Sequence, residues 1–224
     1  MGRRDWAKWH ESYDDPSSAL AHRLAIVQEL LRAELDHLRG GPARLLSLCA
    51  GQGRDVIDVL ARHPRGVDVT ARLVELDHRN VAAACARAAA AGLHGVEVLE
   101  ADAGETDACA GAVPAEVVLV CGVFGNVSDD DIARTVSCLA QLCAPRALVI
   151  WTRHRYPPDV TPAIREWLAM AGFIEEAFVA VDGSLMSVGA HRLVGTPQQL
   201  TRGQRLFSFV GYDRLLGGSQ ARDS

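Results

Sequence analysis

The sequence predicts a doubly wound α/β fold, in which helices cover both faces of a mostly parallel sheet of seven strands. Short apolar runs alternate five times with helical patterns over residues 43–172, which is typical of parallel strands joined by right-handed crossovers. An amphipathic pattern before the first run predicts an N-terminal helix that covers the sheet or forms a lid over its ligand cleft. Alternation over 173–181 and 187–194 predicts a hairpin that closes one edge.

Composition limits the protein classes to consider. The chain has 224 residues, of which 49% are hydrophobic and 23% charged, as expected for one globular domain with a short appendage. No apolar run approaches the roughly 18 residues of a membrane span, and no apolar core follows Arg3 and Arg4 as it would in a signal peptide. The six cysteines include no CxxC pair, so we expect free thiols, a reducing cytoplasmic compartment and no metal.

The net charge of −5 argues against a broad nucleic-acid surface. The C-terminal part is locally basic, and we interpret its arginines as a solvated face: Arg192, Arg202, Arg205 and Arg214.

The first 41 residues combine a lid-like segment and a helix. Residues 1–15 mix aromatic and charged side chains, which suits a segment that packs over something else; they include Trp6, Trp9, His10 and Tyr13. A capping sequence over 14–18 then begins a helix whose leucines and valine recur every three or four residues until Gly40.

The remaining elements follow in order. Strands are expected at 45–49, 67–76, 96–99, 117–121 and 147–151. Helices are expected after the first turn to residue 60, over 79–91, from a cap at Ser128, and from Thr161 to Gly172. Residues 206–211 alternate as a further short strand.

The turn after the first strand, Gly51-Gln52-Gly53, lets a ligand lie close to the backbone. A dinucleotide fingerprint would need a third glycine where Val56 stands, and a phosphate-binding P-loop would need a lysine, whereas the chain's only lysine is Lys8. A nucleoside ligand without phosphate is therefore the better candidate.

Three later strands end in polar or glycine-containing turns at the same edge of the sheet, where ligands bind in such folds. At the end of the second strand of the chain, Glu75 can accept hydrogen bonds from both hydroxyls of a ribose, while Asp77 suits the cap of the next helix. At the third, Asp102 can accept from an exocyclic amine and the Ala103 N–H can donate to a ring nitrogen, which would select adenine. The fourth strand ends in 121–126, where glycines allow close approach beside an aromatic wall and an amide side chain.

Five segments in this order resemble the motifs of class I S-adenosylmethionine-dependent methyltransferases of the small, single-domain type: LLSLCAGQGRD, LVELD, LEADA, LVCGVFGNVSDDD and ALVIWTRHR. The resemblance spans roughly residues 43–210 and implies their Rossmann-like fold and their cofactor, S-adenosylmethionine. The family often has an acid three residues before the alanine-glycine turn and a glycine directly before it. Here Ser47 and Cys49 occupy those places, so other groups would have to hold the methionine end.

The resemblance implies a cofactor-binding set: Ala50, Gly51, Gln52, Gly53, Glu75, Leu76, Asp102, Ala103, Cys121, Gly122 and Phe124. It also implies an organisation in which residues 1–41 form the lid segment and its helix and 42–216 the cofactor-binding catalytic domain. The polar composition of residues 217–224 predicts a disordered tail.

Methyl transfer needs an aligned nucleophile in a dry cleft, and a base only for a weakly acidic hydroxyl or a protonated amine. His154 is the best-placed candidate base, because neighbouring arginines should lower its pKa and keep it neutral. His10 and Tyr13 of the lid are further catalytic candidates. Asn126, Arg153 and Arg155 are candidates for binding the acceptor, the arginines through a carboxylate.

The preferred function is methylation of an oxygen or nitrogen of a small molecule, with no membrane partner and no nucleic acid; a homodimer remains open. RNA or protein methylation is the first alternative. A cofactor-binding protein of this fold without methyl transfer is the second, suggested by Ser47 and Cys49, and an NAD enzyme is a distant further alternative.

Overall fold

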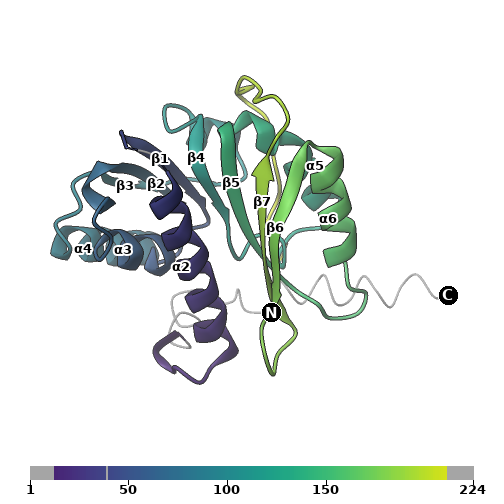
Figure 1. Ribbon diagram of the computed structural model, residues 1–224, viewed down its shortest axis with the longest axis horizontal. Coiled ribbons are helices and arrows are strands. Elements are labelled where there is room, and N and C mark those ends of the chain that lie inside the picture. The colour runs from purple at the N-terminus through teal and green to yellow at the C-terminus, as the bar shows by residue number, and fades with distance from the viewer. Residues whose placement is uncertain (1–12, 39, 211–224) are drawn as a thin grey trace.

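A computed structural model of the protein describes residues 13–38 and 40–210. Its seven strands form one sheet in the order β3-β2-β1-β4-β5-β7-β6 (Figure 1). The first five strands are parallel, and β7 runs antiparallel to both β5 and β6. Their bounds are β1 Ala43–Leu48, β2 Val69–Glu75, β3 Val96–Glu100, β4 Ala115–Val120, β5 Cys143–His154, β6 Phe173–Ala180 and β7 Met186–Leu193. The predicted doubly wound α/β fold is confirmed.

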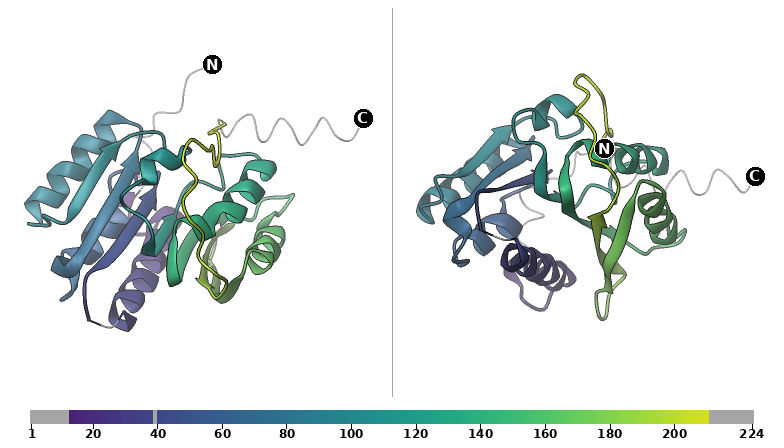
Figure 2. Two further views of the ribbon diagram at one scale, coloured as in Figure 1. Left: turned by 90° about the horizontal axis from the view of Figure 1, so that it is seen from above. Right: turned by 45° about the horizontal axis from the view of Figure 1, so that its top comes forward.

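Helices cover both faces of this sheet, as Figure 2 shows from two further directions. On one face lie α2 (Ala19–His37), α3 (Arg54–Leu60) and α4 (His78–Ala90), and their apolar side chains share a core with β1, β2 and β5. On the other face lie α5 (Asp129–Cys138) and α6 (Thr161–Met170), which enclose the second core. Three short 3₁₀ turns, Gly66–Asp68, Thr106–Cys109 and Leu139–Gln141, complete the connections.

Three predicted helix starts are confirmed by their caps. The side chain of Ser18 accepts a hydrogen bond from the Ala21 N–H, that of Asp77 from the Arg79 N–H, and that of Ser128 from the Asp131 N–H. Each bond satisfies a backbone donor that has no partner inside its helix. The cap at Asp77 matters for the site, because it leaves Glu75 as the acid that faces back toward the turn after β1.

Strand β5 is longer than the sequence predicts, so His154 is its last residue and does not follow it. The extension has a partner on one side, since β7 continues the antiparallel ladder to the pair His154 and Met186. The parallel ladder with β4 stops at Trp151. A partner that comes later in the chain therefore decides where this strand ends.

The prediction of a strand at 206–211 is wrong for residues 206–210, the part of that range that the structure describes. Residues 195–210 form a segment without helix or ladder, here called the C-terminal strap (Figure 2). It begins beside Ala140 and Gln141, before β5, and its last residues reach the carboxyl edge of the sheet at Gly104 and Asn126. It makes one isolated bridge, between Glu105 and Arg205, and its later N–H groups bond to separate elements, such as the Asp131 side chain and the Asn126 carbonyl. Because these acceptors do not lie along one strand, no ladder forms.

Several sequence expectations lie outside the described residues. They concern Trp6, Trp9, His10, Arg214 and the tail at 217–224.

Candidate active site

The turn after β1 has the backbone conformation that its glycines predict. Gly53 precedes α3 with φ of 67°, and a Cβ there would lie 2.6 Å from Ile57 Cδ1 and 2.7 Å from Leu73 Cδ2. Cys49, the residue before Ala50, also has a positive φ of 54°, which is unfavourable for a side chain with a Cβ. The usual family glycine at this place thus corresponds to a left-handed backbone, which Cys49 adopts at some cost.

Glu75, at the end of β2, holds that turn in place. One carboxylate oxygen accepts from the Gly51 N–H at 2.8 Å, and the other accepts from the Asp77 N–H at 2.8 Å. A carboxylate has about four acceptor sites, so both oxygens retain capacity for hydroxyl donors. Glu75 therefore links two strand ends and still fits the expected role toward a ribose. The next residue, Leu76, is 57% exposed and can offer apolar surface there.

Asp102, after β3, is engaged in two ways. Its Oδ1 accepts from the Gly104 N–H at 2.8 Å, which is an Asx turn, and its Oδ2 pairs with the Arg205 guanidinium at 3.1 Å. The strap residue Leu206 donates its N–H to the Gly104 carbonyl at 2.7 Å, next to the buried Ala103. The strap thus forms a wall beside the place expected for adenine, which the sequence did not indicate.

The loop after β4 is closed by its own hydrogen bonds. Asn126 donates from its side chain to the Gly122 carbonyl at 2.7 Å, and the Gly122 N–H donates to the Thr152 hydroxyl at 2.9 Å. Phe124 is fully buried against Trp151, with ring centroids 6.0 Å apart. A Cβ at Gly122 would meet no atom within 4 Å, so open space faces the strand end there.

The two arginines of β5 and its following loop brace neighbouring segments. Arg153 is buried, donates to the Phe124 carbonyl and lies 3.7 Å from Asp129. Arg155 donates to the Ser184 carbonyl at 3.0 Å, in the β6–β7 hairpin. These contacts hold the walls of the site, and a role in recognising a carboxylate on the acceptor stays a prediction.

His154 lies between the β4 loop and an aromatic neighbour. Its ring is 3.5 Å from where a Gly125 Cβ would stand, and its centroid is 5.1 Å from that of Tyr156. Partial burial, and secondarily the charge of Arg153, lowers the pKa of His154 below its ordinary 6.5. The expected direction is confirmed, although burial is the larger cause.

Tyr13 brings the lid to this edge. Its hydroxyl accepts from Arg23 on α2 at 2.6 Å, and the Arg54 guanidinium lies 5.8 Å from its ring centroid. Arg54 also pairs with the neighbouring Asp14 at 2.6 Å. Burial raises the pKa of Tyr13 above its ordinary value of 10.0, which keeps the phenol protonated at neutral pH and suits a donor better than a base.

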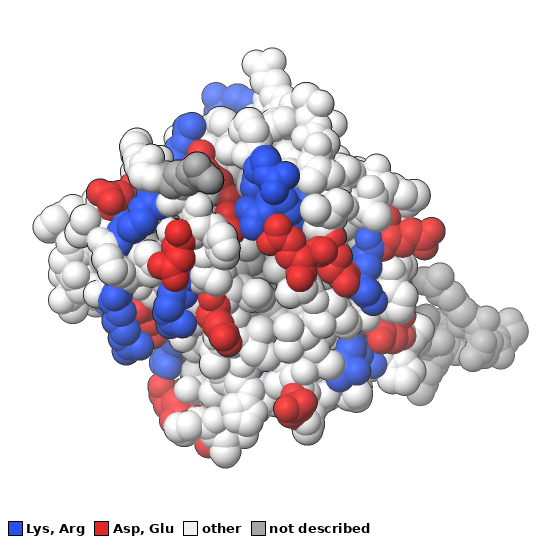
Figure 3. Space-filling view, viewed as in Figure 1, with Lys and Arg blue, Asp and Glu red and all other residues white. Residues whose placement is uncertain are grey.

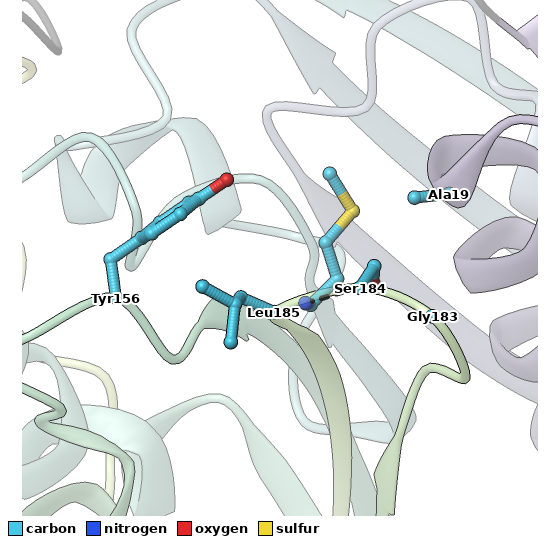
Figure 4. Close-up of a pocket in the computed structure, with 6 residues that line it drawn as sticks. Ala19, Tyr156, Gly183, Ser184 and Leu185 are labelled. Atoms are coloured by element: carbon cyan, nitrogen blue, oxygen red, sulfur yellow. Dashed lines mark hydrogen bonds between the residues drawn. The ribbon is translucent and has the colours of Figure 1, made fainter.

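A hollow of ≈ 550 Å³ opens beside His154. Figure 4 shows Tyr156 and Leu185 on one side and Ala19, at the start of α2, on the other. Gly183, Ser184 and Met186 of the β6–β7 hairpin complete its lining. Because Met186 pairs with His154 in the sheet, the hollow adjoins the carboxyl ends of the strands.

Comparison with known proteins identifies the family. Residues 19–169 match the model of a protein family described as "Putative methyltransferase". The chain belongs to this methyltransferase family. No protein of curated function matches it.

Solved structures agree on the fold. The methyltransferase is similar to 1,6-didemethyltoxoflavin-N1-methyltransferase of Burkholderia thailandensis, with TM-score 0.62, 16% identity, and coverage of 85% of this chain and 87% of that one. It is also similar to magnesium protoporphyrin IX methyltransferase of Synechocystis, with TM-score 0.62, 12% identity, and coverage of 83% of this chain and 92% of that one. A third similar structure is a possible exported protein of Bordetella parapertussis, with TM-score 0.65, 14% identity, and coverage of 86% of this chain and 79% of that one. At these identities the likeness shows the fold.

The protein is therefore an S-adenosylmethionine-dependent methyltransferase, as its motifs indicate, and S-adenosylmethionine is its cofactor. The residues present fit such a group, because Gly122 opens onto free space and Glu75 keeps acceptor capacity at the neighbouring strand end. When bound, the cofactor supplies an electrophilic methyl group. The assignment of individual residues to its parts stays a prediction.

Sequence reasoning missed three features of this edge. It did not single out Tyr156 or the hairpin residues of the hollow, although Tyr156 stands only two positions after His154. It did not join Arg23 to the lid, or the strap to Asp102. Each of these contacts joins residues that are not neighbours in the sequence. Only Tyr156 could have been found from the sequence, through its place two residues after His154.

Proposed function

We propose that this methyltransferase transfers the methyl group to an oxygen or nitrogen of a small, largely apolar acceptor bound in the hollow beside His154. The observation that carries the proposal is the hollow itself, which joins the aromatic ring of Tyr156 and apolar hairpin side chains. His154 does not line the hollow, but its ring centroid lies 5.1 Å from that of Tyr156, which does. A ring-containing acceptor would stack on Tyr156, which is 45% exposed.

Surface charge supports a small acceptor over RNA. The three described arginines of the C-terminal basic group each pair with acids: Arg192 with Glu34 and Glu176, Arg202 with Asp107, and Arg205 with Asp102 and Glu105. On the face seen in Figure 3, basic and acidic side chains are interleaved. This face lacks the basic stripe that phosphate backbones require.

We propose that His154 is the general base for this acceptor. The Tyr156 N–H lies 3.4 Å from His154 Nδ1, so the neutral ring in this arrangement carries its proton on Nε2. In this tautomer Nε2 can donate a proton to the acceptor. To act as a base through Nε2, the ring must first move its proton from Nε2 to Nδ1. The two roles differ in their pH dependence, because only a base loses function when the ring is protonated.

The test is a transfer assay with tritium-labelled cofactor and a panel of phenols, aromatic amines and heteroaromatic compounds. We expect turnover of at least one compound, and a loss of about 100-fold in kcat for His154→Gln. The wild-type rate should be level above pH 7 and fall below the lowered pKa of His154. A rate that stays level in acid would assign His154 as a donor, and labelling of RNA alone would overturn the small-acceptor proposal.

Tyr156→Ala tests the hollow directly. We expect a raised KM for the acceptor with unchanged cofactor affinity, because the aromatic face is lost and nothing at the turn changes. Ile174→Ala is the matched control, since Ile174 is 49% exposed on β6 and does not line the hollow. Equal effects of both substitutions would argue against this hollow as the acceptor site.

No helix among the described residues is long and apolar enough to cross a membrane. We propose a cytoplasmic location, supported by six cysteines that are free in the structure.

A further inference from the structure

One carboxylate at the site has no cationic partner among the described residues. Asp55, in the first turn of α3, accepts a hydrogen bond from the Val56 N–H at 2.9 Å, and no salt bridge joins it to any arginine or histidine there. By contrast, Asp58 on the same helix pairs with Arg87 of α4. An acid that is partly removed from water and left without a salt bridge costs free energy, so it calls for an explanation.

Charged and polar groups surround Asp55 at the carboxyl edge. Arg23 of α2 and Asp58 of α3 act on it electrostatically, and Asp55 in turn influences Tyr13 of the lid and Cys121 at the end of β4. Arg23 is oriented by the 2.6 Å hydrogen bond to the Tyr13 hydroxyl. The Tyr13 ring also lies 5.8 Å from the guanidinium of Arg54, the residue before Asp55, so Tyr13 brings Arg23 to the end of the turn where Asp55 stands. No salt bridge joins Asp55 to Arg23 in the described part of the chain.

This arrangement complements an amino acid. S-adenosylmethionine ends in an α-ammonium and an α-carboxylate, and each needs an opposite charge or several hydrogen bonds when it leaves water. The strand position where the family often has an acid holds Ser47, which is buried and whose hydroxyl has no hydrogen-bond partner in the structure. A hydroxyl cannot neutralise an ammonium, so any counter-charge has to come from another residue.

The geometry points to Asp55 as the residue that binds the α-ammonium of the cofactor, with Arg23, oriented by Tyr13, binding the α-carboxylate. The acid is thus displaced from β1 to the first turn of α3. The inference rests on the cofactor-dependent function and is independent of which acceptor is methylated. Tyr13 acts here as a positioning residue for Arg23.

Burial supports the assignment, because it raises the pKa of Asp55 from its ordinary 3.8 to about 6. An ammonium that neutralises the ionised form would lower that pKa again on binding. Affinity should therefore weaken as the pH falls from 7 to 5, since the acid must then lose a proton before it can bind. The groups that interact electrostatically with Asp55 are Arg23 and Asp58, together with Tyr13 and Cys121, whose pKa values burial raises above their ordinary range.

The experiment measures dissociation constants by calorimetry for two probes. S-adenosylhomocysteine carries the amino-acid end, whereas 5′-methylthioadenosine keeps the nucleoside thioether and lacks it. We expect Asp55→Asn to weaken S-adenosylhomocysteine binding about 10- to 100-fold and to leave methylthioadenosine within about twofold. Binding of methylthioadenosine also shows that the variant is folded.

Two further variants make the assignment specific. Asp58→Asn removes an equal charge from the same helix and should leave the affinities for both probes unchanged. Arg23→Gln should weaken S-adenosylhomocysteine but not decarboxylated S-adenosylmethionine, which keeps the ammonium and lacks the carboxylate. The pH dependence between 5 and 7 should disappear in Asp55→Asn.

Several results would overturn the inference. Equal losses for both nucleosides in Asp55→Asn would assign a structural role to Asp55, and unchanged affinity would exclude it as the anchor. If the wild type binds methylthioadenosine and S-adenosylhomocysteine equally well, no seat for the amino-acid end exists. Failure of the wild type to bind S-adenosylhomocysteine would overturn the cofactor itself, whereas absent turnover with intact binding would count only against the proposed acceptor.

Discussion

The two ends of the cofactor cleft differ in how their acids are satisfied. At the ends of β2 and β3, Glu75 and Asp102 already accept backbone N–H groups, and Asp102 also pairs with Arg205. At the turn after β1, Asp55 accepts from the Val56 N–H and forms no salt bridge within residues 13–38 and 40–210. The first region is complete in the free protein, whereas the second carries a charge that a ligand can neutralise.

The contrast indicates that the acids at the two ends have different roles. Acids that are hydrogen-bonded before binding hold the shape of the cleft, so little ordering remains when the nucleoside part arrives. An acid without a counter-charge destabilises the free protein slightly and gains most on binding, as is common for functional sites. The same residue type thus acts as a brace at one end and as a recognition group at the other.

Glu75→Gln should give the largest effect in this comparison. An amide has one acceptor oxygen, so one of the N–H groups of Gly51 and Asp77 would meet an NH₂ group instead. We expect a loss of about 2–3 kcal/mol in unfolding free energy, and a similar loss in S-adenosylhomocysteine affinity if Glu75 also binds the ribose. Urea denaturation and calorimetry measure the two quantities; an unchanged stability would show that Glu75 does not brace the turn.

Asp55→Asn should act in the opposite direction on the free protein. The folded-state pKa of about 6 exceeds the ordinary 3.8, so between these values the folded protein holds a proton that the unfolded chain has released. Stability conferred by this group therefore falls as the pH rises through that window. We expect the variant to be more stable than the wild type by about 1–2 kcal/mol at pH 8, a value reduced for partial exposure, and equal to it at pH 4.

Urea denaturation at both pH values checks the sign without ligand. A destabilised Asp55→Asn protein at pH 8 would mean that the carboxylate is needed for the fold, and the contrast between the two ends would fail.

Arg205→Ala should give the smallest change. The pair with Asp102 is about half exposed, so its loss should cost less than about 1 kcal/mol in global stability. Locally, the strap should loosen, and exchange of the Leu206 N–H, which bonds to Gly104, should accelerate. Arg202→Ala, which breaks the exposed pair with Asp107 in the same segment, is the matched control and should not affect Leu206.

Much of the fold could be predicted because its signals are local. Apolar runs, helix caps such as Ser18, Asp77 and Ser128, and the glycine turn each depend on neighbouring residues. The far end of β5 and the strap could not be predicted, because their limits depend on partners such as Met186 and Glu105 that are distant in sequence.

The candidate site divides in the same way. Strand ends identify Glu75 and Asp102 as acids at the cleft, since a parallel sheet gathers them at one edge. Their hydrogen-bonded state depends on the turn and on Arg205, which the sequence does not reveal. Asp55 stands inside the recognised motif, but its significance appears only when α2, the lid and β4 are seen around it.

The strap has a consequence for synthesis of the protein. Arg205 follows its partner Asp102 by 103 residues, and ribosomes add about 5–20 residues per second, so roughly 5–20 s separate the two. During that interval the groove that Leu206 and Phe207 will fill stays uncovered. The nascent chain therefore carries, until the strap docks, an uncovered apolar surface of the kind that favours aggregation and chaperone binding.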